Sequence, residues 1–232
     1  MGQPTAHIVF WHSNEGEERV VRLTRLGHAC VRLEKDDMTL VIDPGSFSAP
    51  DVLRGADAVL VTHEHVDHLV PDRLRSAALD NPDLRIWTNP TVAGLLAGTQ
   101  VQAVSHGDAF SIGGVFEVEV HGQWHAVVHP DIPRILNVGF LVNGLVFHPG
   151  DAFTLPERPV DTLMLPVHAP WSKIAEVIDY VRAVRPRRAF PAHDGLLNDV
   201  GLQLVDGLLG DRGPGIGAEY RRPAPAESIE LI

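Results

Sequence analysis

The sequence predicts an α/β fold. Short apolar runs of strand length alternate along it with segments in which apolar residues recur at helical spacing. Hydrophobic residues make up 44% and charged residues 21% of the 232 positions, which is the composition of an ordinary globular protein. This length suits one two-layered α/β domain. We therefore expect a single domain over residues 21–232, preceded by an extension over residues 1–20.

The first half of the chain carries four predicted strands and two predicted helices. The strands are residues 20–23, 30–33, 38–42 and 58–61. A helix is expected to begin near Pro71, because proline suits the first helical position, and Leu74, Ala77 and Ala78 would share its apolar face. A second, shorter helix is predicted over residues 91–96.

The second half repeats this alternation. Five further strands are predicted, at residues 115–120, 138–142, 145–147 and 161–165 and in a short stretch directly before His193. Asn143-Gly144 lies between two of them and is a strong signal for a two-residue hairpin turn. The clearest helix is 171–184, whose apolar residues Ile174, Val177, Ile178, Val181 and Val184 fall on one face. Asn198 is a suitable N-cap for a last helix that runs through Leu209.

Six consecutive residues after the strand 58–61 carry most of the chemistry: His63-Glu64-His65-Val66-Asp67-His68. His63 and His65 are two positions apart, so an extended backbone directs both rings to the same side. Asp67 and His68 follow where a helix is able to begin, so their side chains turn toward a neighbouring point. Imidazole nitrogens with carboxylate oxygens are the donors expected for zinc or a similar divalent metal. Four such donors in one turn indicate two adjacent metal positions.

This H-x-H-x-D-H motif after a strand resembles the signature of the metallo-β-lactamase fold superfamily. The resemblance runs from about residue 21 to about residue 209 and implies an αββα sandwich with its ligand-bearing loops at one edge. It also implies that a later His, an Asp and a last His complete a two-metal site, and His125, Asp151 and His193 follow in that order. In such a site one metal is held by His63, His65 and His125, the second by Asp67, His68 and His193, and Asp151 bridges them.

The resemblance also implies a reaction. Two divalent ions, zinc or otherwise manganese or iron, would share a water and lower its pKa, so that a metal-bound hydroxide attacks the substrate. Asp67 would be the catalytic carboxylate that orients this nucleophile. The segments Gly27-His28-Ala29 and Asp43-Pro44-Gly45, with Trp171 after Leu165-Pro166-Val167, resemble the small ascorbate phosphate lactonase-like branch. We therefore expect a metal-dependent hydrolase of a small ester, lactone or phosphoester.

Five further residues receive supporting roles from the same resemblance. Asp43 is expected to orient the loop that carries the motif. His28 is expected either to lie near the metals or to be a hydrogen-bonded structural residue. His168 and Trp171, between a strand and the long helix, are expected to contact the substrate. The position of His129 in a proline-containing loop that would cover the site makes it either an ordinary exposed loop residue or a further substrate contact.

Two other functions stay open. A mononuclear iron oxygenase of the persulfide dioxygenase type uses a related ligand set, and metal analysis with an oxygen-consumption assay would distinguish it. A non-catalytic metal-containing binding protein would hold metal without turning over any ester. The placement of the donors on open loops at strand ends speaks against this second function.

Composition limits the partners and the location. A net charge of −11 argues against nucleic acid, since binding to its backbone needs clustered cations. No apolar run approaches the roughly 20 residues needed to cross a bilayer, and residues 1–4 do not begin a secretory signal. We therefore expect a cytoplasmic protein with a small-molecule substrate and no membrane partner; a homo-oligomer is left open. The single cysteine, Cys30, is predicted to be a core residue.

The N-terminal extension is expected to be either a tail or an added edge strand from residues 7–11. The strand is favoured, because leaving Ile8, Phe10 and Trp11 exposed would be costly. Deleting residues 1–19 should leave metal binding intact.

Overall fold

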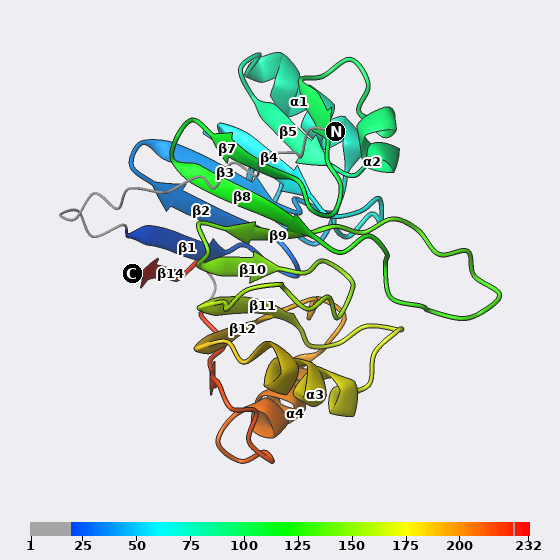
Figure 1. Ribbon diagram of the computed structural model, residues 1–232, viewed down its shortest axis with the longest axis vertical. Helices are drawn as coiled ribbons and strands as arrows, with labels where there is room; N and C mark the ends of the chain where they lie inside the picture. The colour runs from blue at the N-terminus through cyan, green and yellow to red at the C-terminus, as the bar shows by residue number, and fades with distance from the viewer. Residues whose placement is uncertain (1–19, 225) are drawn as a thin grey trace, which may run out of the picture.

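The computed structural model describes residues 20–224 and 226–232. Over these residues the chain forms two mixed seven-stranded sheets that pack face to face, with helices on their outer faces (Figure 1). The first sheet has the order β14-β1-β2-β3-β4-β5-β6: Ser228–Leu231 (β14), Val21–Arg25 (β1), Val31–Lys35 (β2), Met38–Ile42 (β3), Ala58–Val61 (β4), Arg85–Thr88 (β5) and Val101–Ala103 (β6). The second has the order β13-β12-β11-β10-β9-β8-β7: Glu219–Tyr220 (β13), Arg188–Ala192 (β12), Thr162–Pro166 (β11), Val146–His148 (β10), Gly139–Val142 (β9), Phe116–His121 (β8) and Ala109–Ile112 (β7).

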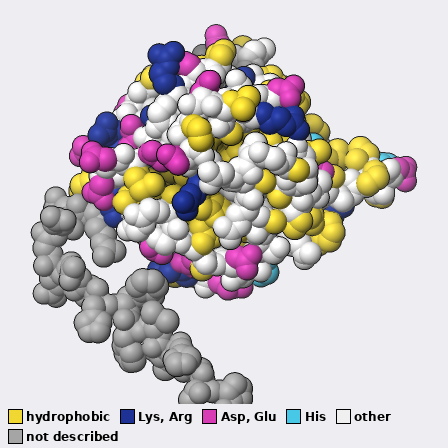
Figure 2. All heavy atoms as spheres, turned by 90° about the horizontal axis from the view of Figure 1, so that it is seen from above, with side chains coloured by type: hydrophobic (Ala, Val, Ile, Leu, Met, Phe, Trp, Pro, Cys, Tyr) yellow, Lys and Arg dark blue, Asp and Glu magenta, His cyan; other side chains and the backbone are white. Residues whose placement is uncertain are grey.

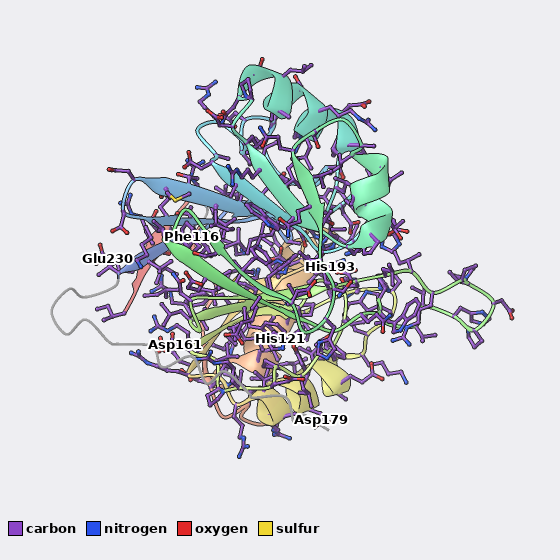
Figure 3. The ribbon with its side chains drawn as sticks, turned by 45° about the horizontal axis from the view of Figure 1, so that its top comes forward. Phe116, His121, Asp161, Asp179, His193 and Glu230 are labelled. Atoms are coloured by element: carbon purple, nitrogen blue, oxygen red, sulfur yellow. The ribbon has the colours of Figure 1, made fainter. Side chains whose placement is uncertain are left out.

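The core consists of three apolar layers. The middle layer fills the space between the two sheets and includes the fully buried Phe116 and Phe140 (Figure 3 labels Phe116). Helices α1 (Pro71–Asp80) and α2 (Pro90–Leu95) cover the outer face of the first sheet through Leu74 and Val92. Helices α3 (Ile174–Val184) and α4 (Asp199–Leu209) cover the second sheet. The αββα sandwich is thereby confirmed.

Most predicted elements are found within a few residues of their expected positions. Asn143 and Gly144 form a tight hairpin turn between β9 and β10, both with positive φ (53° and 65°), which is the backbone of a type I′ turn. The Asn198 side chain accepts a hydrogen bond from the Gly201 N–H and caps α4 as predicted. The helix expected from Trp171 begins at Ile174, because the Lys173 N–H donates to the Glu176 carboxylate at the start of the first turn.

Five strands were not predicted from the sequence: β5, β6, β7, β13 and β14. They are short, between two and four residues, and β6 and β7 have largely exposed side chains, so apolar periodicity does not reveal them. Strand β14 pairs antiparallel with β1 at the edge of the first sheet. The edge strand expected from residues 7–11 lies outside the described residues and stays a prediction.

Two other expectations concern single features. Cys30 is buried in the apolar layer under α1 and α2, and burial raises the pKa of its thiol to about 12, so it is a core residue as predicted. Among residues 20–224 and 226–232, no helix is both long and apolar enough to span a bilayer.

The topology brings the site residues to one edge of the sandwich. Strands β3 and β4 run parallel, as do β10, β11 and β12, so within each set the carboxyl ends point the same way. Asp43 follows β3, and His63 comes two residues after β4. In the second sheet, Asp151, His168 and His193 come shortly after β10, β11 and β12. Side chains there are positioned by rigid strands yet are carried on loops.

Candidate metal centre

The H-x-H-x-D-H motif forms a compact turn that packs against the loop after β3. The His68 and Leu69 N–H groups both donate to the His65 carbonyl, at 3.0 and 2.8 Å, which closes the turn. Gly45 allows the neighbouring loop to approach, because a Cβ at this position would lie 1.8 Å from the Asp67 carbonyl oxygen. The hydrogen bonds within the turn and its close packing against Gly45 therefore fix the backbone from which the motif's side chains project.

Two clusters of potential metal donors lie at this edge. His63, His65, His125 and Asp151 form the first cluster, and their donor atoms lie within 4.8 Å of one another. His65 Nδ1 is 3.1 Å from His63 Nε2, and Asp151 Oδ2 is 3.4 Å from His125 Nε2 and 4.0 Å from His63 Nε2. This brings together all the residues expected for the first metal.

The second cluster contains Asp67, His68 and His193, together with His28. Asp67 Oδ2 lies 3.4 Å from His193 Nε2 and 3.9 Å from His68 Nε2. Asp151 also reaches this cluster, since its Oδ1 is 3.0 Å from His68 Nε2 and its Oδ2 is 3.0 Å from His193 Nε2. Asp151 therefore lies between the two clusters. His193, the last of these histidines, directly follows β12 and is labelled in Figure 3.

Hydrogen bonds fix the orientation of four of the imidazoles. The Nδ1–H groups of His125 and His193 donate to the carbonyls of Ala126 and His168, both at 2.6 Å. His68 Nδ1–H donates to Asp43 Oδ2 at 2.7 Å. The fourth ring, that of His63, contacts the Thr62 hydroxyl through Nδ1 at 3.0 Å, and this hydroxyl itself donates to Asp43. In each neutral ring the proton is then on Nδ1, and the Nε2 lone pair faces the centre.

His28 has the opposite tautomer. Its Nδ1 accepts a hydrogen bond from the Gly195 N–H at 2.9 Å, so the proton of the neutral ring is on Nε2. Burial lowers the pKa of His28, which favours this neutral form. Nε2–H then donates to Asp67 Oδ2 at 3.0 Å. His28 lies among the potential metal ligands of the second cluster, but it donates a hydrogen bond to one of them, Asp67. Of the two roles expected for His28, these contacts favour the hydrogen-bonded one.

The electrostatics of the centre favour a cation. Burial alone would raise the pKa of Asp151, but the surrounding His68, His125 and His193 hold it well below its usual range. Burial alone would lower the pKa of His193, but hydrogen bonds to Asp151 and Asp67 raise it to about 9. The two carboxylates therefore hold positive charge on the His193 ring, at a position where a metal would replace the proton.

The donor set also fits a metal sterically. His68 Nε2, His125 Nε2 and Asp151 Oδ1 are buried and make no hydrogen bond of normal geometry in the described part of the chain, although His68 Nε2 and Asp151 Oδ1 lie 3.0 Å apart. Such atoms are costly to bury unless an ion or another group satisfies them. Tetrahedral zinc with bonds of about 2.0–2.1 Å places its donor atoms about 3.3 Å apart. The separations of 3.0–4.0 Å between neighbouring donors include this value.

Asp43 and Trp171 support the donors directly. Asp43 is fully buried and accepts from the Thr62 N–H at 2.8 Å as well as from His68, so it joins the end of β4 to the motif as expected. Trp171 was expected to border the substrate pocket, but it also contacts a potential metal ligand directly: its Nε1–H donates to Asp151 Oδ2 at 3.1 Å. This contact was not predicted, since it joins residues 20 positions apart on two loops.

The other two residues expected to contact substrate are less central. His168 meets the centre through its backbone carbonyl, which accepts from His193, while its side chain is half-buried. His129 lies on an exposed part of its loop, and its Nδ1 accepts from the Asp131 N–H. The described contacts of His129 thus involve its own loop and bring it to none of the donors.

Three of the expected site residues, His28, Asp43 and His193, have positive φ (45°, 51° and 57°), a strained conformation for non-glycine residues that functional sites commonly contain. Sequence reasoning missed the ion pairs that hold the His193 loop. Asp194 is paired with Arg25, 2.6 Å away, and also with Arg222. The only sequence signal for these ion pairs is that a carboxylate, Asp194, directly follows the predicted ligand His193.

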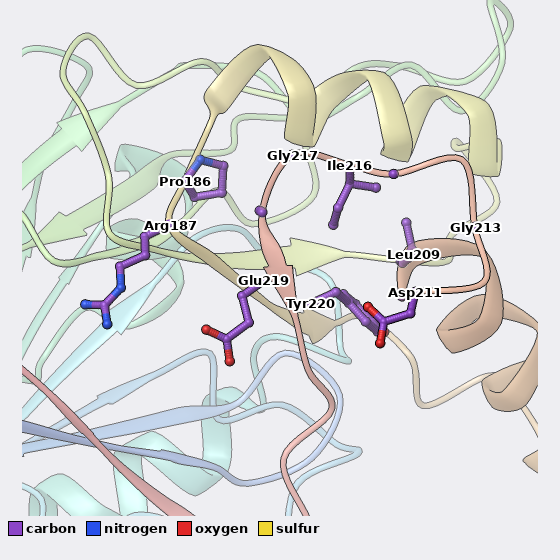
Figure 4. A pocket seen from close by; sticks show the side chains of 12 residues that line it. Pro186, Arg187, Leu209, Asp211, Gly213, Ile216, Gly217, Glu219 and Tyr220 are labelled. Carbon is purple, nitrogen blue, oxygen red and sulfur yellow. The ribbon is translucent and has the colours of Figure 1, made fainter.

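Pocket size does not identify this centre. A pocket of about 620 Å³ lies at the outer edge of the second sheet, beside Arg187, Asp211 and Tyr220 (Figure 4). Another, of about 670 Å³, lies next to α1. Neither is lined by a donor of the two clusters. The donors instead border a small cavity between His65, His125 and the loop that follows β8.

Residues 22–193 match the family described as Beta-lactamase superfamily domain. Protein Rv0786c of Mycobacterium tuberculosis is 39% identical to this chain over 183 residues, covering 76% of this chain and 85% of that protein. A UPF0173 metal-dependent hydrolase of Aeropyrum pernix is 26% identical over 206 residues, covering 76% and 83% of the two chains.

Solved structures share the fold. Igni18, a metallo hydrolase from Ignicoccus hospitalis, aligns with a TM-score of 0.69 at 20% identity over 92% of this chain and 99% of its own. The metallo-β-lactamase fold protein YhfI from Bacillus subtilis aligns with a TM-score of 0.65 at 15% identity over 92% of this chain and 100% of its own. The family match over residues 22–193 and the αββα sandwich together lead to one conclusion: this chain belongs to the metallo-β-lactamase fold superfamily.

Proposed function

We propose that this chain is a metal-dependent hydrolase that holds two divalent metal ions and acts on a small ester, lactone or phosphoester. His63, His65 and His125 would hold one ion, and Asp67, His68 and His193 the other, with Asp151 between them. Zinc is the proposed metal, because five imidazoles and two carboxylates are donors that suit it.

One observation carries the proposal. His63, His68, His125 and His193 all hydrogen-bond outward through Nδ1, and their Nε2 atoms face two carboxylates. Four Nε2 atoms that converge on two carboxylates need positive charge between them, which protons supply without metal and divalent ions would supply with it. The relatives add support, since the protein from Aeropyrum pernix is named a metal-dependent hydrolase.

When bound, the ions supply Lewis-acid polarisation of the scissile group and a water of lowered pKa. The protein's own residues orient and hold protons. Asp67 uses Oδ2 to accept from His28, and its Oδ1 has no hydrogen-bond partner among the residues described, so this oxygen is available to orient the attacking water. Burial alone would raise the pKa of Asp67, but hydrogen bonds from His193 and His28 lower it. Asp67 therefore acts as an ionised acceptor and does not store a proton.

Metal analysis tests the first half of the proposal. Protein purified without added metal should contain close to two equivalents of zinc, manganese or iron in total. His125→Ala and His193→Ala should each lower the content, because each removes one donor from a different cluster. His106→Ala is the matched control, since this histidine is exposed and belongs to neither cluster. Equal metal content in all four proteins would contradict the assignment.

Turnover tests the second half. The metal-loaded protein should hydrolyse members of a panel of lactones, carboxylic esters and phosphodiesters, and the activity should be lost in His125→Ala and His193→Ala. Oxygen consumption with a thiol persulfide would identify an iron oxygenase instead. Full metal content without turnover of either kind would favour a non-catalytic binding protein.

A further inference from the structure

Exposed apolar side chains gather beside the donor clusters. Of the thirteen large apolar side chains exposed in the described residues, six lie on loops that adjoin the donors: Phe47, Val66, Trp124, Val127, Val128 and Ile132. We call these six the apolar rim. Single exposed apolar residues are ordinary, but a contiguous group of them commonly marks a binding surface.

The rim is continuous with the donors. Val66, 65% exposed, lies between His65 and Asp67 in the motif itself. Its carbonyl accepts from the Ser46 N–H, and the next residue, Phe47, packs edge-on against the His28 ring at 5.0 Å. On the other side, Val127, Val128 and Ile132 line the small cavity that His65 and His125 also line. A molecule whose reacting group reached the donors would therefore contact the rim.

The loop that carries most of the rim is fixed to the centre at its base. It joins β8 to β9 and extends beyond the body of the protein (Figure 1), where Figure 2 shows apolar side chains along it. The Ala126 N–H donates to the Asp151 carbonyl at 2.8 Å, and Arg134 Nε–H donates to the His125 carbonyl at 2.6 Å. The Arg134 guanidinium also lies 5.9 Å from the Trp124 ring centre. These contacts fix both ends of the loop beside the donors, and with them the starting positions of its apolar side chains.

We propose that the apolar rim binds an alkyl, acyl or aryl group of the substrate, next to the bond that is hydrolysed. The inference rests on the proposed hydrolase function and narrows its substrate class to esters, lactones or phosphoesters with an apolar substituent. A second copy of the chain would cover the rim equally well on chemical grounds, but it would not explain why the rim lines the same cavity as two metal donors.

Binding of straight-chain hydroxamic acids tests the inference without turnover. Their head group chelates zinc, and the chain length varies from two to ten carbons. Calorimetric titration of the metal-loaded protein should show affinity rising about two- to fourfold per added methylene, where fourfold corresponds to full burial. Val127→Ser and Ile132→Ser should flatten this rise without changing the affinity for the two-carbon acid. Leu79→Ser, exposed on α1, is the matched control and should leave the rise intact.

Several outcomes would overturn the inference. Binding of the two-carbon acid with no dependence on chain length would refute the rim's role and leave the hydrolase proposal intact. Protein that takes up no metal refutes the hydrolase proposal, and the inference with it. Sedimentation showing a dimer that Ile132→Ser dissociates, together with a flat chain-length series, would identify the rim as a contact between copies.

Discussion

Replacing His28 with alanine should weaken one metal site without removing a ligand. His28 is 3% exposed, and its Nε2–H donates to Asp67 Oδ2 at 3.0 Å. A hydrogen bond to a charged acceptor contributes about 1.5–3 kcal/mol. Since about 1.4 kcal/mol is tenfold in affinity, the site that contains Asp67 should bind metal about 10- to 100-fold more weakly. This is the range expected on losing the hydrogen-bond partner of a ligand.

The assay is a zinc titration of the metal-free protein in competition with a chromophoric chelator. The alanine variant should still bind two equivalents, with only one of the two binding constants reduced, that of the site containing Asp67. His28→Gln distinguishes a donor from a ligand, because a glutamine amide can donate to Asp67 but is a poor zinc ligand. Glutamine should therefore recover most of the lost affinity.

A second variant reaches the same contact while keeping His28. A Cβ at Gly195 would lie 2.9 Å from His28 Nδ1. The His28 ring has little room to move away, because the centre of the His193 ring is 4.2 Å from its own centre. Gly195→Ala should therefore displace His28 and reproduce the loss. Gly94→Ala is the control, as a Cβ there meets nothing within 4 Å. If His28→Gln binds as weakly as His28→Ala and the stoichiometry falls to one, His28 is a ligand and the tautomer assignment is wrong.

Four further outcomes follow from the same contacts. Asp67→Asn should lower kcat by about 100-fold or more while KM changes little, because orientation of the nucleophile acts in the transition state; unchanged kcat on a true substrate would contradict this. His168→Ala should leave metal content unchanged, since only its carbonyl holds His193, and should raise KM if the side chain contacts substrate; the check is metal analysis with steady-state kinetics. Phe140→Ala should destabilise the fold by about 3–5 kcal/mol in urea unfolding, because the ring is fully buried between the sheets. Asp206→Asn should lower the free energy of unfolding by about 1–2 kcal/mol at pH 7. Burial alone would raise the pKa of Asp206, but hydrogen bonds from Arg222 and Tyr220 lower it below its ordinary value of 3.8. The ionised carboxylate therefore stabilises the fold above pH 3.8, and the difference in unfolding free energy between wild type and variant should disappear as the pH falls below that value.

Local spacing explains why much of the site could be predicted. His63, His65, Asp67 and His68 lie within one turn, so the chain's own geometry keeps their side chains together whatever surrounds them. The Asn143-Gly144 turn is equally local, because the two positive φ values it needs are favoured by these two residues. The αββα arrangement was implied by the resemblance of the motif, whereas the order of strands and helices predicted only an α/β fold.

The sequence by itself determined the donor types, their order along the chain and the strands that carry them. Only the tertiary structure decided how each donor is oriented. Asp67 meets His28, which is 39 positions away, and the tautomer of His28 depends on Gly195, which is 167 positions away. The contact of Trp171 with Asp151 and the pairing of Asp194 with Arg25 also join segments that are separate in the sequence. Residue spacing fixes which side chains are neighbours within one turn, whereas proton positions and hydrogen-bond partners depend on packing between segments that local sequence does not encode.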